Sequence, residues 1–315
     1  DRLGVVLEAE ERRDRPEDLL ARHAHVRRHV GDDGRLEEGA AERVRFAAAQ
    51  NARAFHDSVG EQFHEIISIH TNSGMSNYYY LVAGLPSVSL DDGKLSYTVE
   101  NFKSELYPSL SDKDKKLIDL FYLKFDNINL LKLLKDKDAG IDERGNFSAE
   151  ELLLLIEAVR QGDACEKKFP SYLYDFIALY LQNSGEEHFV AEEALAAAYY
   201  AYAMRCGNRF ISRWFEFSLN VNNILSAFIL RKYKMEVAPR IVGDTEVCEQ
   251  LRTSNARDFG LGEQLAYMEE LQRIAEMEEL VEREKKTDLL AWKWLEDESF
   301  FNYFTVERLF VFLLQ

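Results

Sequence analysis

The chain has 315 residues, of which 46% are hydrophobic and 12% aromatic, and its formal net charge is −17. This composition indicates a globular protein with a sizeable core and argues against a disordered chain. The acidity argues against a nucleic-acid partner, which needs a basic face, and no apolar run is long enough for direct membrane insertion. The three cysteines are widely spaced along the chain, so they build neither a disulfide framework nor a zinc site.

Residues 1–74 differ in composition from the rest of the chain. They contain eleven Arg and six of the seven His but no Lys, Tyr or Trp, whereas residues 75–315 contain all sixteen Lys and all fifteen Tyr. This division indicates two coding origins, either an upstream start assigned in error or a foreign N-terminal domain. With few large apolar residues, the first segment is expected to form a loosely packed helical extension. We predict that the evolved domain begins at Met75 and that Tyr78 to Leu81 anchor its first segment.

Four residues of the N-terminal extension have spacings found in metal sites. His25 and His29 would share one helix face, and Glu61 and His64 form a Glu-x-x-His pair. A di-metal carboxylate site needs a second such pair and two further glutamates on facing helices, and the sequence does not contain them. We therefore expect solvated histidines, no metal site and no cofactor.

Hydrophobic periodicity from residue 75 onward predicts an all-α fold. Pro86 and Gly93 break the first segment, and a short helix is expected before Pro108. Ser111 is expected to cap a long helix, and Ser148 forms a capping box with Glu151. With these three, the helices predicted up to residue 235 lie within residues 98–110, 111–138, 148–162, 170–183, 190–207 and 208–235.

The final third is predicted to begin with a helix capped by Asp244. Two helices are expected in residues 289–315, and the last one ends at Gln315 within its apolar stripe, which predicts a domain truncated at the C-terminus. Between the helix capped by Asp244 and residue 289 we expect one long amphipathic helix. Its apolar stripe is formed by Leu261, Leu265, Met268, Leu271, Ile274, Met277 and Val281.

Candidate catalytic motifs are weak. Residues 136–151 resemble a calcium loop, but counting from Asp136 places Phe147 where the bidentate carboxylate belongs, so an interhelical loop is the better interpretation. The chain lacks a Walker-type phosphate loop and a Gly-x-Ser-x-Gly motif, and its one histidine after residue 74, His188, lies in an acidic turn. We therefore expect no catalytic and no cofactor-binding residues, and a helical enzyme is the third-ranked hypothesis.

A short repeat is more specific. Residues 125–138 and 219–234 align at an offset of 94, which matches Asp126 with Asn220 and Asn129 with Asn223. Each pair lies on one helix face, where short polar side chains can bond backbone groups of a neighbouring helix or loop. Both copies end in basic residues, including Arg231 in the second and Lys137 near the end of the first. The repeat predicts a multi-lobed helical bundle, and a chance match is the alternative.

From Met75 to Gln315 the chain resembles a bacterial family of uncharacterised proteins encoded among V-type (A/V-type) ATPase genes. The resemblance lies in "MSNYYYLVAGLP", "DGKLSYTVENFKSELYP", "KKLIDLFYLKFDNINLLKLLKDKD" and "RGNFSAEELLLL". That family is similar in gene position and helical build to the C subunit of the V-type ATPase, called d in eukaryotes. The pairs Asp126/Asn129 and Asn220/Asn223 are similar to the pattern that recurs in its lobes, and Arg231 to its basic ending. A clear third copy is missing here.

The resemblance implies a mechanical function. The C subunit joins the central stalk to the membrane rotor ring, and it needs stiffness and a complementary surface, not a nucleophile. The expected protein is a non-catalytic V-type ATPase component that couples stalk and ring in proton or sodium transport. Its partners would be the central-stalk subunits and the rotor ring, and it would be cytoplasmic and peripheral to the inner membrane through that complex. The alternative is a stand-alone helical scaffold or regulatory binding protein without ATPase association.

Overall fold

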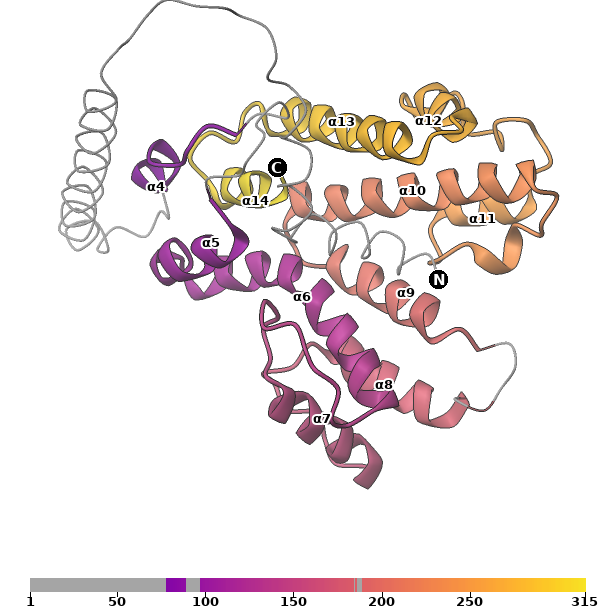
Figure 1. The fold of residues 1–315 in the computed structure, drawn as a ribbon. Coiled ribbons are helices and arrows are strands. Elements are labelled where there is room, and N and C mark those ends of the chain that lie inside the picture. The colour runs from indigo at the N-terminus through magenta and orange to yellow at the C-terminus, as the bar shows by residue number, and fades with distance from the viewer. Residues whose placement is uncertain (1–77, 89–96, 184, 186–188) are drawn as a thin grey trace, which may run out of the picture. The chain divides into compact units, whose positions relative to one another are not determined.

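The computed structural model describes residues 78–88, 97–183, 185 and 189–315. The chain divides between Met75 and Ser76 into two compact units, and all the described residues belong to the second. Within the described ranges every regular element is helical, which confirms the all-α prediction (Figure 1). The extension of residues 1–74 and the candidate metal ligands His25, His29, Glu61 and His64 lie outside the described residues, as does His188.

The described helices follow one another along the chain. The two 3-10 turns are η1 (Tyr107–Ser109) and η2 (Ala238–Arg240). The α-helices are α4 (Tyr79–Ala83), α5 (Val99–Glu105), α6 (Asp112–Lys135), α7 (Ala149–Gln161), α8 (Ser171–Asn183), α9 (Ala191–Ala203), α10 (Arg209–Lys232), α11 (Glu246–Thr253), α12 (Met268–Glu276), α13 (Leu280–Ser299) and α14 (Val306–Leu314).

Side-chain caps of the same kind begin helices in several parts of the chain. Ser111, Ser148, Asn208 and Thr245 each accept a hydrogen bond from the backbone N–H three residues later, at the starts of α6, α7, α10 and α11. Each cap satisfies a helical N–H group that would otherwise lack a partner. The cap of α11 is therefore Thr245 and not Asp244, because the Thr245 hydroxyl is the group that reaches the third N–H.

The helices form two successive lobes of similar element order. The first lobe is α6–α9, in which α6 contacts α7 and α9, and α8 also contacts both; the second is α10–α13, in which α10 contacts the other three. In Figure 1, α10 lies between α13 and α9, so it joins the lobes. Helices α6 and α10 both have 24 residues. A spacing of 97 residues relates the first residues of three helix pairs: Asp112 and Arg209, Ala149 and Glu246, Ser171 and Met268.

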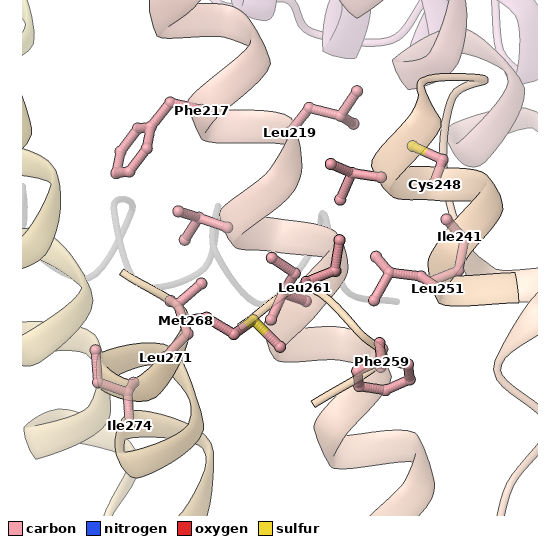
Figure 2. Close-up of a cluster of buried hydrophobic side chains, with 14 of the residues drawn as sticks. Phe217, Leu219, Ile241, Cys248, Leu251, Phe259, Leu261, Met268, Leu271 and Ile274 are labelled. Carbon is pink, nitrogen blue, oxygen red and sulfur yellow. The ribbon is translucent and has the colours of Figure 1, made fainter. Parts of the chain in front are cut away.

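The second lobe has a continuous apolar core, shown in Figure 2. Leu219 of α10 lies near Cys248 of α11, Leu251 of α11 lies near Leu261, and Leu271 and Ile274 contribute from α12. Burial of each large apolar side chain of this kind is worth about 1.5–3 kcal/mol. The connection between α11 and α12 also enters this core, through Phe259 and Leu261, which are fully buried.

The long amphipathic helix predicted for the final third is wrong, because the chain turns twice within it. The Asp258 carboxylate accepts hydrogen bonds from the N–H groups of Gly260 and Gly262, and Phe259 has a left-handed φ of 57°. These turns precede α12, and an extended Met277 then separates α12 from α13. The apolar stripe is therefore divided among a turn and two helices, and Val281 is 52% exposed.

The segment predicted to anchor the start of the domain is only partly buried. Tyr78 and Leu81 are buried, and the Tyr78 hydroxyl donates to the carboxylate of Asp114. Tyr79 and Tyr80 are 48% and 44% exposed, because the short helix α4 turns only one face inward.

Candidate functional site

Asn129 joins α6 to the loop that follows it. Its side chain is fully buried, and both polar atoms bond the backbone of Asp142. Nδ2 donates to the Asp142 carbonyl at 2.8 Å, and Oδ1 accepts from the Asp142 N–H at 2.8 Å. The amide thus supplies both hydrogen bonds that a paired strand would supply, so it holds the loop of residues 136–148 to α6.

Asn223 makes the same pair of hydrogen bonds in the second lobe. Its Nδ2 donates to the Val242 carbonyl at 2.7 Å, and its Oδ1 accepts from the Val242 N–H at 3.0 Å. We call these two arrangements the amide clamps: Asn129 on Asp142, and Asn223 on Val242. In each lobe the clamp connects a 24-residue helix to the loop that leads into the next helix.

Asp126 lies one turn before Asn129 and holds the end of the same loop. Its carboxylate is fully buried and accepts from the N–H groups of Asn146, at 2.9 Å and 3.0 Å, and of Phe147, at 3.0 Å. Lys103 of α5 reaches the same turn, where its Nζ donates to the Gly145 carbonyl at 2.6 Å. The loop is therefore fixed from two helices immediately before α7 begins.

The buried charges at this turn influence one another. Burial raises the pKa of the Asp126 carboxyl from 3.8 to about 6, although the N–H groups of Asn146 and Phe147 and the charge of Lys103 act in the opposite direction. Burial likewise lowers the pKa of Lys103 and is opposed by the carboxylates of Asp126 and Asp119. At neutral pH, Asp126 is thus an ionised group stabilised by donors but still penalised by desolvation.

The raised pKa of Asp126 predicts a pH-dependent contribution to stability. Because the folded state holds this proton more tightly than the unfolded state, the contribution is fully present below about pH 4 and is lost as the pH rises through about 6. The loss amounts to roughly 3 kcal/mol at 1.36 kcal/mol per pKa unit. Urea unfolding of the wild type and of Asp126→Asn across this range measures it, since the variant lacks the titrating group. A constant difference between the two proteins would contradict the assignment.

Asn220 does not repeat the bonds of Asp126, although the sequence aligns the two residues. It is buried on α10 and hydrogen-bonds the Tyr267 hydroxyl, a contact that opposes the raising of the Tyr267 pKa by burial. Among the described residues its Oδ1 has no hydrogen-bond donor. The two copies of the repeat therefore make equivalent contacts through Asn129 and Asn223. The residues three positions earlier, Asp126 and Asn220, make different contacts.

Arg231, at the end of α10, holds the turn that follows α11. Its guanidinium donates to the carbonyls of Ala256 at 2.5 Å and Ser254 at 2.8 Å, and it lies 3.6 Å from the centroid of the Phe259 ring. Lys137, its sequence counterpart in the first lobe, is exposed. In that lobe several cations lie over aromatic rings, among them Arg144 at 4.4 Å from the Phe125 ring and Lys124 at 4.2 Å from the Phe121 ring.

The comparison with protein families assigns this chain. Residues 75–315 match the model described as "Protein of unknown function (DUF2764)". The chain belongs to the DUF2764 family. The match begins at Met75, the residue at which the amino-acid composition changes. Searches of curated proteins and of solved structures found no match.

The polar groups of this DUF2764 domain that the sequence singled out serve mainly to position loops. The amides of Asn129 and Asn223 bond backbone groups, as does the carboxylate of Asp126. Cys248 is buried, and its thiol donates to the Val242 carbonyl at 3.2 Å beside the second clamp. Within the described ranges no cluster of three His, Cys, Asp or Glu residues could hold a metal ion. The same ranges contain no helix with the length and apolar character to cross a bilayer.

Arg231→Ala should destabilise the DUF2764 domain by about 1–2 kcal/mol, because it removes charge-assisted hydrogen bonds and a cation–π contact from one turn. Lys232→Ala, an exposed neighbour on the same helix, should change stability by less than about 0.5 kcal/mol. Urea denaturation of both variants measures the difference. Equal effects would show that Arg231 does not hold the turn.

Proposed function

We propose that this DUF2764 protein is a non-catalytic component of a V-type ATPase that couples the central stalk to the membrane rotor ring during proton or sodium transport. The resemblance of residues 75–315 to proteins encoded among V-type ATPase genes supports the proposal, and the observation that carries it is the pair of amide clamps. A coupling subunit transmits torque, so its helices must not shift against their connections. Each clamp ties a long helix to its following loop by two hydrogen bonds within the protein interior.

The two-lobed build also supports a mechanical role. Successive lobes with the same helix order create one body from repeated units, and α10 belongs to the second lobe while packing on α9 of the first. In this proposal the protein lies on the cytoplasmic side, peripheral to the inner membrane, and its partners are the stalk subunits and the rotor ring. The polar side chains of the clamps hold shape and do not react with a substrate.

A stand-alone helical scaffold is the second candidate. Exposed aromatic side chains favour a protein-binding role that needs no ATPase, because such rings are enriched at protein interfaces. Phe300 and Phe301 are 60% and 87% exposed, and Tyr303 is 56% exposed. These rings contact one another in the connection between α13 and α14.

Affinity purification from the native host tests the proposal. The tagged chain should recover stalk and rotor subunits from solubilised membranes, and a host strain without the ATPase genes serves as the control. Deletion of the gene should also reduce ATP-driven ion uptake by inverted membrane vesicles more than ATP hydrolysis, since a coupler links the two. Recovery of other proteins without any ATPase subunit, together with unchanged ion uptake, would favour the scaffold.

A further inference from the structure

A basic depression lies at the C-terminal end of α10. It has a volume of about 450 Å³ and is formed by α10, the turn after α11, and α12. Three of its side chains are cationic and one is a carboxylate, in a chain whose net charge is −17. Its lining residues are Phe228, Arg231, Lys232, Arg257, Gln272, Ala275 and Glu276.

Two of the three cations of this depression, Lys232 and Arg257, are available to an anion, whereas Arg231 bonds backbone carbonyls. Lys232 and Arg257 are exposed, and in the part of the chain that the structure describes neither forms an ion pair with a carboxylate. When the Gln272 amide is oriented with its oxygen towards Arg257, this oxygen accepts hydrogen bonds from the Arg257 guanidinium. This contact orients the guanidinium without neutralising it. The helix dipole favours basic residues in the last turn of α10, but it does not account for Arg257, which comes from another segment.

A fourth cation occupies a position where a lysine is costly. Lys234 has a left-handed φ of 56°, which favours glycine. Its N–H bonds the Arg231 carbonyl and the N–H of Met235 bonds the Leu230 carbonyl, so Lys234 is at the residue of a Schellman turn that is usually glycine. Lys234 follows the lining residue Lys232 by two positions, and a strained residue that adds charge at this helix end points to a function for that charge.

Apolar groups accompany the basic ones. Phe228 and Ala275 line the depression, and Tyr233 and Met235, on either side of Lys234 in the chain, are 67% and 53% exposed. Aromatic residues, Met and Arg are enriched at protein interfaces. A ligand for this surface therefore carries both carboxylates and apolar side chains.

We propose that this end of α10 binds an acidic peptide segment of a partner protein, with carboxylates at Lys232, Lys234 and Arg257 and an apolar side chain against Phe228. Guanidinium groups match carboxylates in shape as well as charge. The negative net charge opposes approach to extended anionic surfaces such as membranes and nucleic acids, whereas a short peptide encounters mainly the local field. The inference is independent of the ATPase proposal, because it depends only on the charge and shape of this end.

Fluorescence anisotropy with the full-length chain tests the proposal. The probe is a labelled peptide of Glu, Asp and Leu, and the comparison probe has Gln and Asn in place of the acids. The acidic probe should bind at least about tenfold more tightly than the neutral one, and added salt should weaken the binding. The paired substitutions Lys232→Glu and Arg257→Glu should weaken it by about tenfold or more. Lys286→Glu with Lys293→Glu, two exposed lysines of α13, changes the net charge equally and should have little effect.

Lys234→Gly separates binding from folding. Glycine relieves the left-handed strain, so the midpoint of thermal unfolding should rise while the acidic probe binds several-fold more weakly. Loss of affinity in a more stable protein cannot result from unfolding.

Three results would overturn the proposal. The first is no binding of the acidic peptide, and the second is equal loss in the two double variants. The third combines two observations. The acidic peptide binds no more tightly than the neutral one, and inorganic phosphate or phosphatidylglycerol vesicles displace the labelled peptide at concentrations where an unlabelled peptide of Gln, Asn and Leu does not. That result would assign the surface to phosphate groups.

Discussion

Gly145→Ala is expected to lower the free energy of unfolding by roughly 2–3 kcal/mol, in the upper range of overpacking substitutions. A Cβ at this position would lie 3.2 Å from Cγ of Asp126 and 3.3 Å from Nδ2 of Asn129, and closer still to a carboxylate oxygen of Asp126. Neither side chain can move freely, because Asp126 accepts from the N–H groups of Asn146 and Phe147, and Asn129 is held by its clamp.

Gly140→Ala is the matched control for this prediction. Gly140 lies in the same loop, and a Cβ there would meet no atom within 4 Å. Alanine should therefore be neutral or slightly stabilising, since it reduces the freedom of the unfolded chain. Urea denaturation followed by circular dichroism compares the two variants. If both alanines behaved alike, the close approach of the loop to Asp126 would not be required for the fold.

Asn223→Ala is expected to cost about 2–4 kcal/mol. The substitution removes two hydrogen bonds: the Val242 N–H loses its acceptor, and the Val242 carbonyl keeps only the weak donor Cys248. Each such loss costs about 1–3 kcal/mol. Asn129→Ala should have an effect of similar size through Asp142, if the two clamps are equivalent.

Asn222→Ala provides the control for the second clamp. Asn222 precedes Asn223 on α10 but is exposed and bonds only the Tyr200 hydroxyl among the described contacts, so its removal should cost less than about 1 kcal/mol. Denaturation midpoints of the wild type and the three variants give the comparison directly. If a clamp variant were as stable as Asn222→Ala, water would replace the hydrogen bonds of the amide without loss of stability.

Much of the site lies within reach of sequence reasoning because it depends on short spacings. The offset of 94 residues identified Asn129 and Asn223, and helical spacing placed each beside a polar residue on one face. Short amides on a helix face commonly bond nearby backbone, and here the bonded residues follow within the next loop. The same reasoning gave Asn220 the role of Asp126, and there it was wrong, because the direction of a buried amide depends on its neighbours. Asn220 meets Tyr267, from a segment far along the chain.

Other parts of the site had no sequence signal that distinguishes them. Gly145 resembles any loop glycine until the carboxylate of Asp126 is found where a Cβ would lie. Lys103 lies on α5, at a sequence separation of 42 from Gly145, whose carbonyl it bonds. The strain at Lys234 could be suspected only from its position after a helix end, since no local rule places a lysine in a left-handed turn.

The sequence by itself determined the helical class, most helix starts and the paired asparagines. Periodic apolar residues and capping side chains act within a few residues, so their effect can be read without knowing what packs nearby. Only the tertiary structure decided that the predicted long helix is divided by turns before Met268 and by the extended Met277, that Asn220 is not a clamp, and that Arg257 meets the end of α10. Those features depend on contacts between segments that are distant in the sequence. The free energy of such contacts depends on how the segments fit together, and it exceeds the conformational preferences of the individual residues.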